Sequence, residues 1–306
     1  MSLAVARTLR SSGVFLVLLS AVLWGTVGVT VASLYRLADV DATTVGVLRL
    51  ALSVPALLAA TVLLRQQRGL RLNLRFALLI LLMGLAMAAY QVCYFAAVRE
   101  AGVAVAVLIS LCTAPVWVAL LSTVVFRERL RPHAVGLLFA ALIGAALLVY
   151  RPHGLGTDGA DLLVGALLAL GAALSYAVIA LTSRALAPLA SPLVSLTAAF
   201  SLSTAVLLPL TWRDLVGVTL PLPAWGLLVY LGVVTTALGY VLFLRGMRTT
   251  PATLASVVTL LEPLVAVLLA ALLLGERLAP LGLLGAVVLL VAVGLLSTMF
   301  NKEGGQ

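Results

Sequence analysis

Long hydrophobic segments follow one another along most of the chain, and short polar or charged breaks separate them. An α-helix needs about 20 mostly apolar residues to cross the hydrocarbon core of a bilayer, and each segment is close to this length. The longest break, between Arg65 and Arg75, is too short for a soluble domain. The pattern therefore predicts ten membrane-spanning helices, over residues 13–34, 42–64, 76–97, 102–125, 133–150, 161–183, 191–211, 224–244, 251–274 and 280–299.

The overall composition indicates the same class of protein. Of the 306 residues, 64% are hydrophobic and only 9% are charged, and the mean hydropathy is +1.25. Soluble domains are about 25% charged and about half apolar, so a soluble chain of this composition would be unable to cover its surface. We expect an all-α membrane protein that is surrounded by the lipid bilayer.

The net charge of +9 follows the expected topology and does not indicate a nucleic-acid partner. If the N-terminus is cytoplasmic, thirteen of the nineteen Lys and Arg residues fall in cytoplasmic segments and five fall on the opposite side. Basic residues are enriched on the cytoplasmic side of membrane proteins. The distribution thus predicts that both the N- and the C-terminus are cytoplasmic.

The two halves of the chain match each other at an offset of 148 positions. Residues 128–132 and 276–280 share the pattern Glu-Arg-Leu-x-Pro, and at the same offset Pro115 meets Pro263 and Gly84 meets Gly232. Self-similarity of this kind indicates a repeated structural unit. We expect one five-helix repeat in residues 1–155 and a second in residues 156–306.

Because each repeat has an odd number of spans, the second must enter the membrane from the opposite side. Inverted repeats of this kind are typical of secondary transporters, which place the substrate site near the bilayer midplane between the repeats. Gly136, Ala140 and Gly144 in the fifth span follow the small-xxx-small pattern of closely packed helices, which predicts a helix contact there. The sequence predicts ten helices in two inverted repeats with a central site.

Several residues carry a resemblance to a known family. They are Trp24, Gly25, Arg49, Pro115 and Glu128 in the first half and Glu262, Pro263, Gly275 and Glu276 in the second. With this set the chain resembles the EamA branch of the drug/metabolite transporter superfamily over residues 13–299. It departs at Arg127, where the first repeat of the family usually has Gly. The resemblance implies an exporter of amino acids or related metabolites in a bacterial cytoplasmic membrane.

One acidic and one basic residue, Glu262 and Arg49, lie well inside predicted spans. An ionisable group at the bilayer centre costs about 3 kcal/mol on insertion scales and indicates a functional site by default. Glu262 can serve as a proton site, bind an amino group of a substrate or pair with Arg49. The alternative for both residues is a structural role in holding helices together.

Pro115 and Pro263 lie about halfway through the fourth and ninth spans. Each proline removes a helical hydrogen bond and frees the carbonyl four residues earlier, at Leu111 and Thr259. Freed carbonyls are tolerated at membrane depth only where protein packs them or where they line a wet cavity. Because the prolines match in the two repeats, we favour a kink in the central pathway over a purely structural one.

Aromatic and hydroxyl side chains are spread over several spans and are candidates for the walls of a small-molecule cavity. In the third span Met83, Met87, Tyr90 and Tyr94 share one helical face. Helix–helix packing is the alternative explanation for such a stripe. The candidate pathway residues are Trp24, Tyr90, Tyr94, Ser110, Thr113, Trp117, Ser175, Tyr176, Thr235 and Glu262.

No residue constellation indicates an enzyme. The sequence has no nucleotide-binding Walker A motif, and His133 and His153 are expected in turns, so no metal ligands are grouped. We expect no cofactor, no metal and a chain that works as a monomer on a small-molecule substrate. An aromatic cavity with one carboxyl and one guanidinium group favours apolar or aromatic amino acids. The alternatives are export of drugs or other metabolites and, in a different class, a permease subunit or an intramembrane enzyme.

Overall fold

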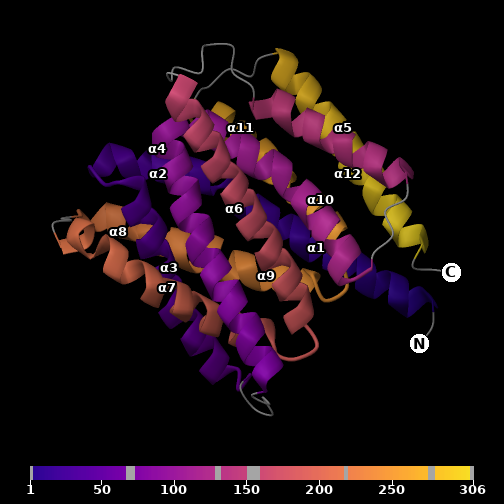
Figure 1. Cartoon of the computed structure of the whole chain (residues 1–306), viewed down its shortest axis with the longest axis horizontal. Coiled ribbons are helices and arrows are strands. Elements are labelled where there is room, and N and C mark those ends of the chain that lie inside the picture. Colours follow the sequence, from indigo (N-terminus) through magenta and orange to yellow (C-terminus); the bar gives the residue numbers. More distant parts are fainter. Residues whose placement is uncertain are drawn as a thin grey trace.

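The computed structural model describes residues 3–66, 73–127, 132–149, 159–216, 220–274 and 280–303, and every regular element in them is a helix. Figure 1 shows how these helices are arranged. In chain order they are α1 (Leu3–Gly25), α2 (Val27–Leu37), α3 (Ala42–Leu63), α4 (Leu74–Val125), α5 (Pro132–Val149), α6 (Gly159–Leu186), α7 (Pro192–Val216), α8 (Leu222–Val229), the π-helix η1 (Tyr230–Leu238), α9 (Gly239–Gly246), α10 (Ala252–Val258), α11 (Leu261–Leu274) and α12 (Pro280–Glu303).

Eight stretches of helix are long and apolar enough to cross a membrane. They are Ser12–Leu37, Ala42–Leu63, Leu74–Ala101, Val105–Val125, Leu162–Leu186, Pro192–Arg213, Leu222–Gly246 and Ala252–Leu273. Two further apolar helices, Val135–Leu147 and Pro280–Leu296, are shorter and correspond to the fifth and tenth predicted spans. The expectation of an all-α protein with many membrane-spanning helices is confirmed, with eight spans supported by length and composition.

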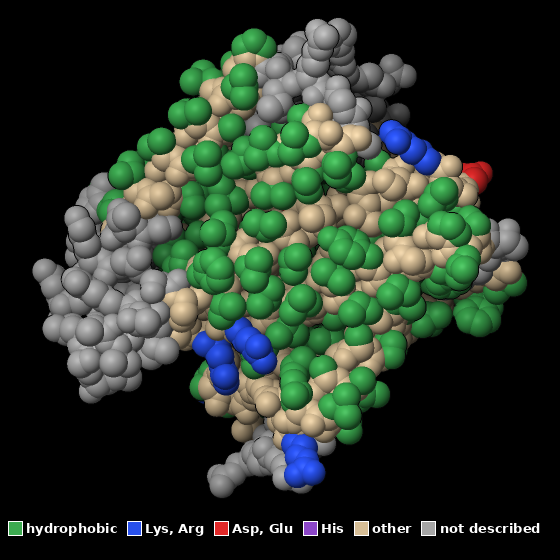
Figure 2. All heavy atoms as spheres, turned by 180° about the vertical axis from the view of Figure 1, so that it is seen from behind, with side chains coloured by type: hydrophobic (Ala, Val, Ile, Leu, Met, Phe, Trp, Pro, Cys, Tyr) green, Lys and Arg blue, Asp and Glu red, His purple; other side chains and the backbone are tan. Residues whose placement is uncertain are grey.

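The surface of the molecule is suited to lipid. Figure 2 shows hydrophobic side chains over most of one face, with the visible Lys and Arg side chains toward its edges. Large apolar side chains such as Leu222, Leu272 and Val124 are 84%, 78% and 77% exposed. Apolar surface this extensive is rare on soluble monomers, whereas lipid tails solvate it without penalty.

The third and fourth predicted spans belong to one helix, α4, which has 52 residues. A straight helix of this length would extend about 78 Å, more than twice the roughly 30 Å of a bilayer core, and Figure 1 shows that α4 bends. The predicted spans 76–97 and 102–125 correspond to two separate membrane-spanning stretches, Leu74–Ala101 and Val105–Val125, but helical backbone continues between them. Arg99 and Glu100, which suggested a break, pair with each other at 3.0 Å within the helix.

Three other predicted spans are interrupted. The first divides into α1 and α2 at Thr26, the eighth contains η1, and the ninth divides into α10 and α11 at Thr259 and Leu260. All three remain membrane-spanning stretches, but the breaks within 13–34 and 224–244 were not expected from the sequence, whereas a kink within 251–274 was. The break in the ninth span falls at the carbonyl that Pro263 leaves without a donor, whereas α4 continues through Pro115.

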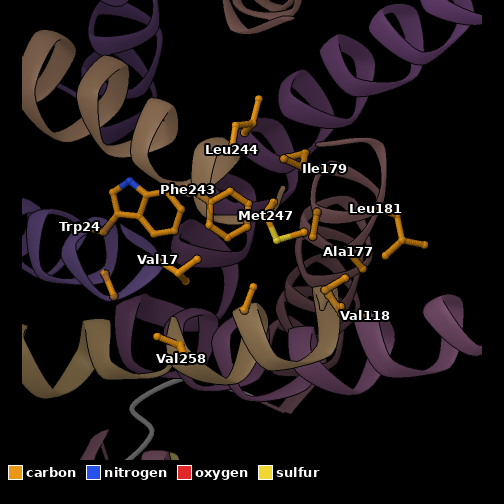
Figure 3. Close-up of a cluster of buried hydrophobic side chains, with 14 of the residues drawn as sticks. Val17, Trp24, Val118, Ala177, Ile179, Leu181, Phe243, Leu244, Met247 and Val258 are labelled. Carbon is orange, nitrogen blue, oxygen red and sulfur yellow. The ribbon is translucent and has the colours of Figure 1, made fainter. Parts of the chain in front are cut away.

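Helices from distant parts of the sequence pack against one another. α1 contacts α9, α10 and α11, α3 contacts α7 and η1, and α4 contacts α6 along its length. The largest core cluster joins side chains of these helices, and Figure 3 shows Trp24 of α1, Phe243 of α9 and Val258 of α10 within it. This packing gathers the interrupted helices α1–α2, η1 and α10–α11 in the same part of the molecule.

α5 lies beside α12 (Figure 1). A Cβ on Gly144 would lie 2.9 Å from the carbonyl oxygen of Gly285 and 2.6 Å from the backbone nitrogen of Leu289, so this glycine lets the two helices approach closely. Gly136 has nothing within 4 Å of such a Cβ, and the predicted contact at that position is wrong. His133, expected in a turn, lies in the first turn of α5.

Candidate functional site

A cavity of about 360 Å³ lies among the helices, and both halves of the chain contribute to its walls. The walls come from α1, α2, α3, α4, α6, η1, α9, α10 and α11, and most of the lining side chains are apolar or aromatic. Besides Trp24 and the tyrosines, the lining residues with polar side chains are the Ser and Thr residues, one Arg and one Glu: Arg49, Ser110, Thr235, Thr236, Ser256, Thr259 and Glu262.

Irregular backbone borders this cavity on three sides. Trp24 and Val27 flank the break between α1 and α2, Thr235 belongs to η1, and Thr259 lies at the break between α10 and α11. π-Helical segments are frequent at functional sites, and interrupted helices at membrane depth are tolerated where they line a cavity. The irregular backbone segments therefore lie at the same cavity as the polar and aromatic side chains.

A guanidinium group and a carboxyl group face this cavity without forming an ion pair. Arg49 comes from α3 and Glu262 from the first turn of α11. Among the described residues the one ion pair is between Arg99 and Glu100, so the direct Arg49–Glu262 pair considered from the sequence is not formed. The side chain of Arg49 instead donates a hydrogen bond from Nη2 to Gln91 Oε1 at 3.3 Å. The Glu262 carboxylate has no hydrogen-bond partner within the described part of the chain.

Aromatic side chains form two parts of the wall. The indole Nε1 of Trp24 donates to the carbonyl of Thr235 at 3.1 Å, and its ring lies 4.9 Å from that of Tyr240. On α4, Tyr90 and Tyr94 are one turn apart, with stacked rings whose centroids are 5.8 Å apart. The indole and phenol rings offer flat apolar surface and a polar tip, which suits ligands with an apolar body.

The hydroxyl groups in the wall are mostly engaged within their own helices. Thr235 donates to Leu231 O at 2.7 Å, and Ser256 donates to Thr253 O at 2.8 Å. Thr259 donates to Ser256 O at 2.8 Å, so the phenol of Tyr176, 3.1 Å from the Thr259 hydroxyl, must be the donor in that bond. Because their protons are used, these Ser and Thr oxygens offer acceptor lone pairs to the cavity.

The structure brings together nine of the residues singled out from the sequence. Trp24, Arg49, Tyr90, Tyr94, Ser110, Pro115, Tyr176, Thr235 and Glu262 all line the cavity. The predicted stripe on the third span divides, because Met83 and Met87 are 0% and 3% exposed and belong to the core while the two tyrosines reach the cavity.

Four candidates lie elsewhere. The hydroxyl of Thr113 donates to Ile109 O at 2.7 Å and that of Ser175 to Gly171 O at 2.8 Å, each within its own helix. Trp117 packs against the core cluster, and Pro263 is buried behind the break that it causes. None of these four lines the cavity. A role of Thr113, Trp117 and Ser175 in the pathway stays a prediction, and Pro263, which was expected to kink its helix, follows the break between α10 and α11.

Other cavity residues carried little signal in the sequence. Tyr35, Phe95 and Tyr240 line the cavity, and Gln91 holds Arg49 from behind the wall. Gln91 is a neutral polar residue one position after Tyr90 in an apolar span. A buried amide in a membrane helix needs a partner, and this requirement is the signal by which it could have been found.

Within the described ranges no three His, Cys, Asp or Glu residues are grouped as metal ligands. The predicted turn residues Glu128, Gly275 and Glu276 lie outside these ranges. The other residues that carried the family resemblance meet in space: a Cβ on Gly25 would lie 2.9 Å from the carbonyl oxygen of Glu262. Residues from the first and second halves of the chain thus approach each other beside the cavity.

Comparison with known proteins decides the family. Residues 11–150 and residues 163–298 each match the EamA-like transporter family. This chain belongs to the EamA-like transporter family. Members of the EamA-like family are transporters, which agrees with the resemblance stated from the motif residues.

Relatives extend over most of this EamA-like chain. The uncharacterized transporter YwfM of Bacillus subtilis is 32% identical over 289 residues, which cover 94% of each chain. The pseudopaline exporter CntI of Pseudomonas aeruginosa is 32% identical over 197 residues, 64% of this chain and 66% of that protein. An uncharacterized transporter of Archaeoglobus fulgidus is 33% identical over 201 residues, 65% of this chain and 69% of that protein.

A solved crystal structure has the same fold as this EamA-like protein. It superposes with a TM-score of 0.81 over 96% of this chain and 98% of the other, at 22% sequence identity. Identity at this level supports the fold alone. The chain is therefore a multi-pass membrane transporter of the EamA-like family with a cavity between its halves.

Proposed function

We propose that the protein is a secondary transporter that exports small metabolites, foremost apolar and aromatic amino acids, by alternating access. The observation that carries this proposal is the cavity, in which aromatic walls surround one guanidinium and one carboxylate that do not pair. A zwitterion with an apolar side chain matches that set, because it offers one group to each charge and a hydrophobic body to the rings.

The size of the cavity supports a small substrate. Ligand pockets in proteins span about 300–1,000 Å³, and this cavity, at about 360 Å³, lies near the lower end. A single amino acid fits such a space better than an extended multi-ring compound. Phosphate-bearing substrates are disfavoured, because Arg49 is the one basic side chain in the cavity wall and a phosphate group calls for more positive charge.

For the architecture we propose ten spans in two inverted repeats, residues 1–155 and 156–306. Two separate matches to one family support a repeat. The packing supports it too: a Cβ on Gly84 would lie 3.0 Å from Ala199 O on α7, and a Cβ on the matching Gly232 would lie 3.0 Å from Arg49 O on α3. Each repeat thus uses the same glycine to contact the other repeat.

The distribution of basic residues supports a proposal for the location and orientation of the protein. We propose that the protein acts as a monomer in a bacterial cytoplasmic membrane with both termini in the cytoplasm, because basic residues concentrate on that side of the predicted topology. Two repeats around one cavity make a complete pathway without a second chain.

A second candidate within the same class is export of another metabolite. One relative is named a pseudopaline exporter, which favours pseudopaline or a related metabolite as cargo. The described site gives no support to an intramembrane enzyme or a permease subunit, because Glu262 is the one carboxyl group among the lining residues and forms no ion pair there.

The test is transport by the purified chain alone in liposomes. Vesicles loaded with unlabelled phenylalanine or leucine should take up the labelled amino acid by exchange, without ATP and without a partner protein. The panel includes pseudopaline and cationic drugs to separate the candidate cargoes. No exchange of any amino acid would overturn the amino-acid proposal, and exchange that requires ATP would overturn the secondary mechanism.

Glu262 tests the role of the cavity carboxylate. We expect Glu262→Gln to lower exchange at least about tenfold and to remove the dependence of net transport on external pH, because Gln keeps the shape but can neither carry charge nor release a proton. Glu100→Gln is the matched control, since Glu100 pairs with Arg99 outside the cavity. Full transport by Glu262→Gln with an unchanged pH profile would exclude this carboxylate from the mechanism.

A further inference from the structure

A series of hydrogen bonds behind the cavity wall links the backbone of Gly46 through the side chain of Gln91 to Arg49, and we call it the relay. Gln91 of α4 is 4% exposed and does not line the cavity. Its Nε2 donates to the carbonyl of Gly46 in α3 at 3.0 Å, and its Oε1 accepts from Arg49 Nη2 at 3.3 Å. The bond to Gly46 O requires the amide nitrogen, so it also fixes the orientation in which the amide oxygen faces Arg49.

Gly46 is required for this arrangement. A Cβ at that position would lie 3.2 Å from Gln91 Nε2 and would overlap the ring of Phe95. A larger residue would therefore push α4 away from α3 at the level of Arg49. The glycine lets the relay form between two helices that otherwise make few contacts.

The relay leaves most of the guanidinium group without a partner. Arg49 makes one hydrogen bond among the described residues, and its Nε is buried with none. A guanidinium has several more donors in a planar fork. Glu262 does not neutralise it by an ion pair, and the amide of Gln91 brings no charge. In a cavity of low dielectric, such a cation favours an anionic ligand strongly.

We propose that Arg49, held by Gln91, is the subsite for the carboxylate of the substrate, while Glu262 and the acceptor hydroxyls of α10 take its ammonium group. This inference rests on the proposed amino-acid substrate and adds which end of it binds where. A guanidinium fork matches a carboxylate with two parallel hydrogen bonds. Gln91 is a positioning residue, because it touches Arg49 and not the substrate.

The hydrogen bonding near each of the two charged groups agrees with this polarity. Near Glu262 in the chain, Ser256 and Thr259 donate their protons to backbone carbonyls and offer lone pairs, which suits a group that only donates. At Arg49, the hydrogen-bond partner Gln91 accepts from the guanidinium and leaves its further donors free, which suits a group that only accepts. An amino acid in the reverse orientation would bring like charges together at both ends.

The experiment measures binding and transport separately. The purified chain is titrated with phenylalanine, with phenylalanine amide and phenethylamine, which lack the carboxylate, and with 3-phenylpropionate, which lacks the amine. Tryptophan fluorescence reports binding, because Trp24 lies in the cavity wall and these phenyl compounds do not absorb at its excitation wavelength. Exchange of labelled phenylalanine in liposomes is recorded for the same preparations.

The informative variant is Gln91→Glu. It keeps the size of the side chain but places a carboxylate against Arg49, so it occupies and neutralises the guanidinium. We expect phenylalanine and 3-phenylpropionate to bind at least about tenfold more weakly, with phenethylamine unchanged or tighter. Arg49→Gln should give the same selective loss. Gln66→Glu is the matched control, because it makes the same chemical change at an exposed residue in the turn after α3 that does not line the cavity.

The outcomes separate the two proposals. A loss confined to the carboxylate-bearing compounds supports the subsite, whether or not phenylalanine is transported. An equal shift for all four compounds, or wild-type binding of the amide as tight as that of phenylalanine, overturns it. Wild-type protein that binds neither carboxylate-bearing compound also overturns it. Absence of exchange with Arg49-dependent carboxylate binding intact would overturn the transport proposal alone.

Discussion

At the scale of single residues, the cavity depends on how Trp24 is held. Its indole N–H donates to Thr235 O at 3.1 Å, and its ring lies 4.9 Å from that of Tyr240 between centroids. The ring of Phe243 lies 5.4 Å away and is seen beside Trp24 in Figure 3. Gly239 makes room for it, because a Cβ there would lie 2.8 Å from the indole nitrogen. One side chain of α1 thus ties this helix to η1 and α9 at the cavity wall.

Replacing Trp24 with Phe keeps an aromatic ring but removes the N–H donor. The hydrogen bond to the Thr235 carbonyl is lost, which is worth about 0.5–1.5 kcal/mol. We expect a lower melting temperature and weaker phenylalanine binding, measured by thermal unfolding and by titration. Trp212→Phe is the control, since Trp212 is 60% exposed and outside the wall. Equal effects of the two substitutions would contradict the role given to Trp24.

At the scale of elements, Pro263 sets the break between α10 and α11. The proline has no N–H to give to Thr259 O, four residues earlier. That carbonyl instead accepts from Glu262 N at 3.0 Å, a spacing of three residues that tightens the backbone. The break turns both Thr259 and Glu262 toward the cavity. A helix-breaking residue outside the wall therefore determines what the wall contains.

Pro263→Ala restores the missing donor and removes the ring, a difference of about 3 kcal/mol in a helix interior. We expect α10 and α11 to join, with a higher melting temperature and at least several-fold slower exchange in liposomes, because the break that turns Thr259 and Glu262 toward the cavity is lost. Pro209→Ala in α7 is the matched control, since Pro209 is also inside a helix but not in the wall. Normal exchange rates in Pro263→Ala would show that the break serves packing alone.

At the scale of the whole molecule, α5 and α12 pair with each other apart from the binding region. No described residue of either helix lines the cavity, and Gly144 allows their close contact. Figure 1 shows the two helices side by side. Their contact should contribute to stability without altering recognition.

Gly144→Leu tests this separation. The added side chain would meet the backbone of Gly285 and Leu289, and overpacking of this kind costs about 1–3 kcal/mol. We expect a lower melting temperature with phenylalanine affinity unchanged. Gly136→Leu, on the same helix with open space around it, should leave both unchanged. A change in affinity without a change in stability would contradict the division between the pair and the cavity.

The sequence predicted the class of fold and the chemically strongest part of the site. Runs of apolar residues suffice to find membrane helices, and Glu262 and Arg49 are conspicuous because charges inside spans are rare. The facing of each helix was harder to predict. These spans are apolar on all sides, so hydrophobic periodicity does not show which face turns inward. For this reason the sequence could not tell that Thr113 and Trp117 do not line the cavity.

The irregular backbone was also beyond the sequence, except where a proline marks it. Thr26 and η1 carry no proline, and both breaks are set by tertiary contacts: Thr26 bonds to Tyr230 at 2.9 Å, and Thr235 O bonds to Trp24. The continuity of α4 could not be predicted because two adjacent charged residues, Arg99 and Glu100, are typical of a loop between spans. In the structure they form an ion pair within the helix.

The π-helix η1 has a consequence for insertions and deletions. A π-helical turn holds an additional residue, and both Thr235 and Thr236 bond to the same carbonyl of Leu231 as a result. Deleting one residue of η1 would close the wide turn to ordinary helix geometry, whereas deleting one residue from a regular helix rotates everything after it by about 100°. Tyr240 and Phe243 would then stay close to their present orientation toward Trp24, and the change would be confined to the turn whose Thr235 carbonyl accepts from the indole. We therefore expect a one-residue deletion in η1 to harm the aromatic wall less than the same deletion in the regular helix α6, where the register of Tyr176 would be lost.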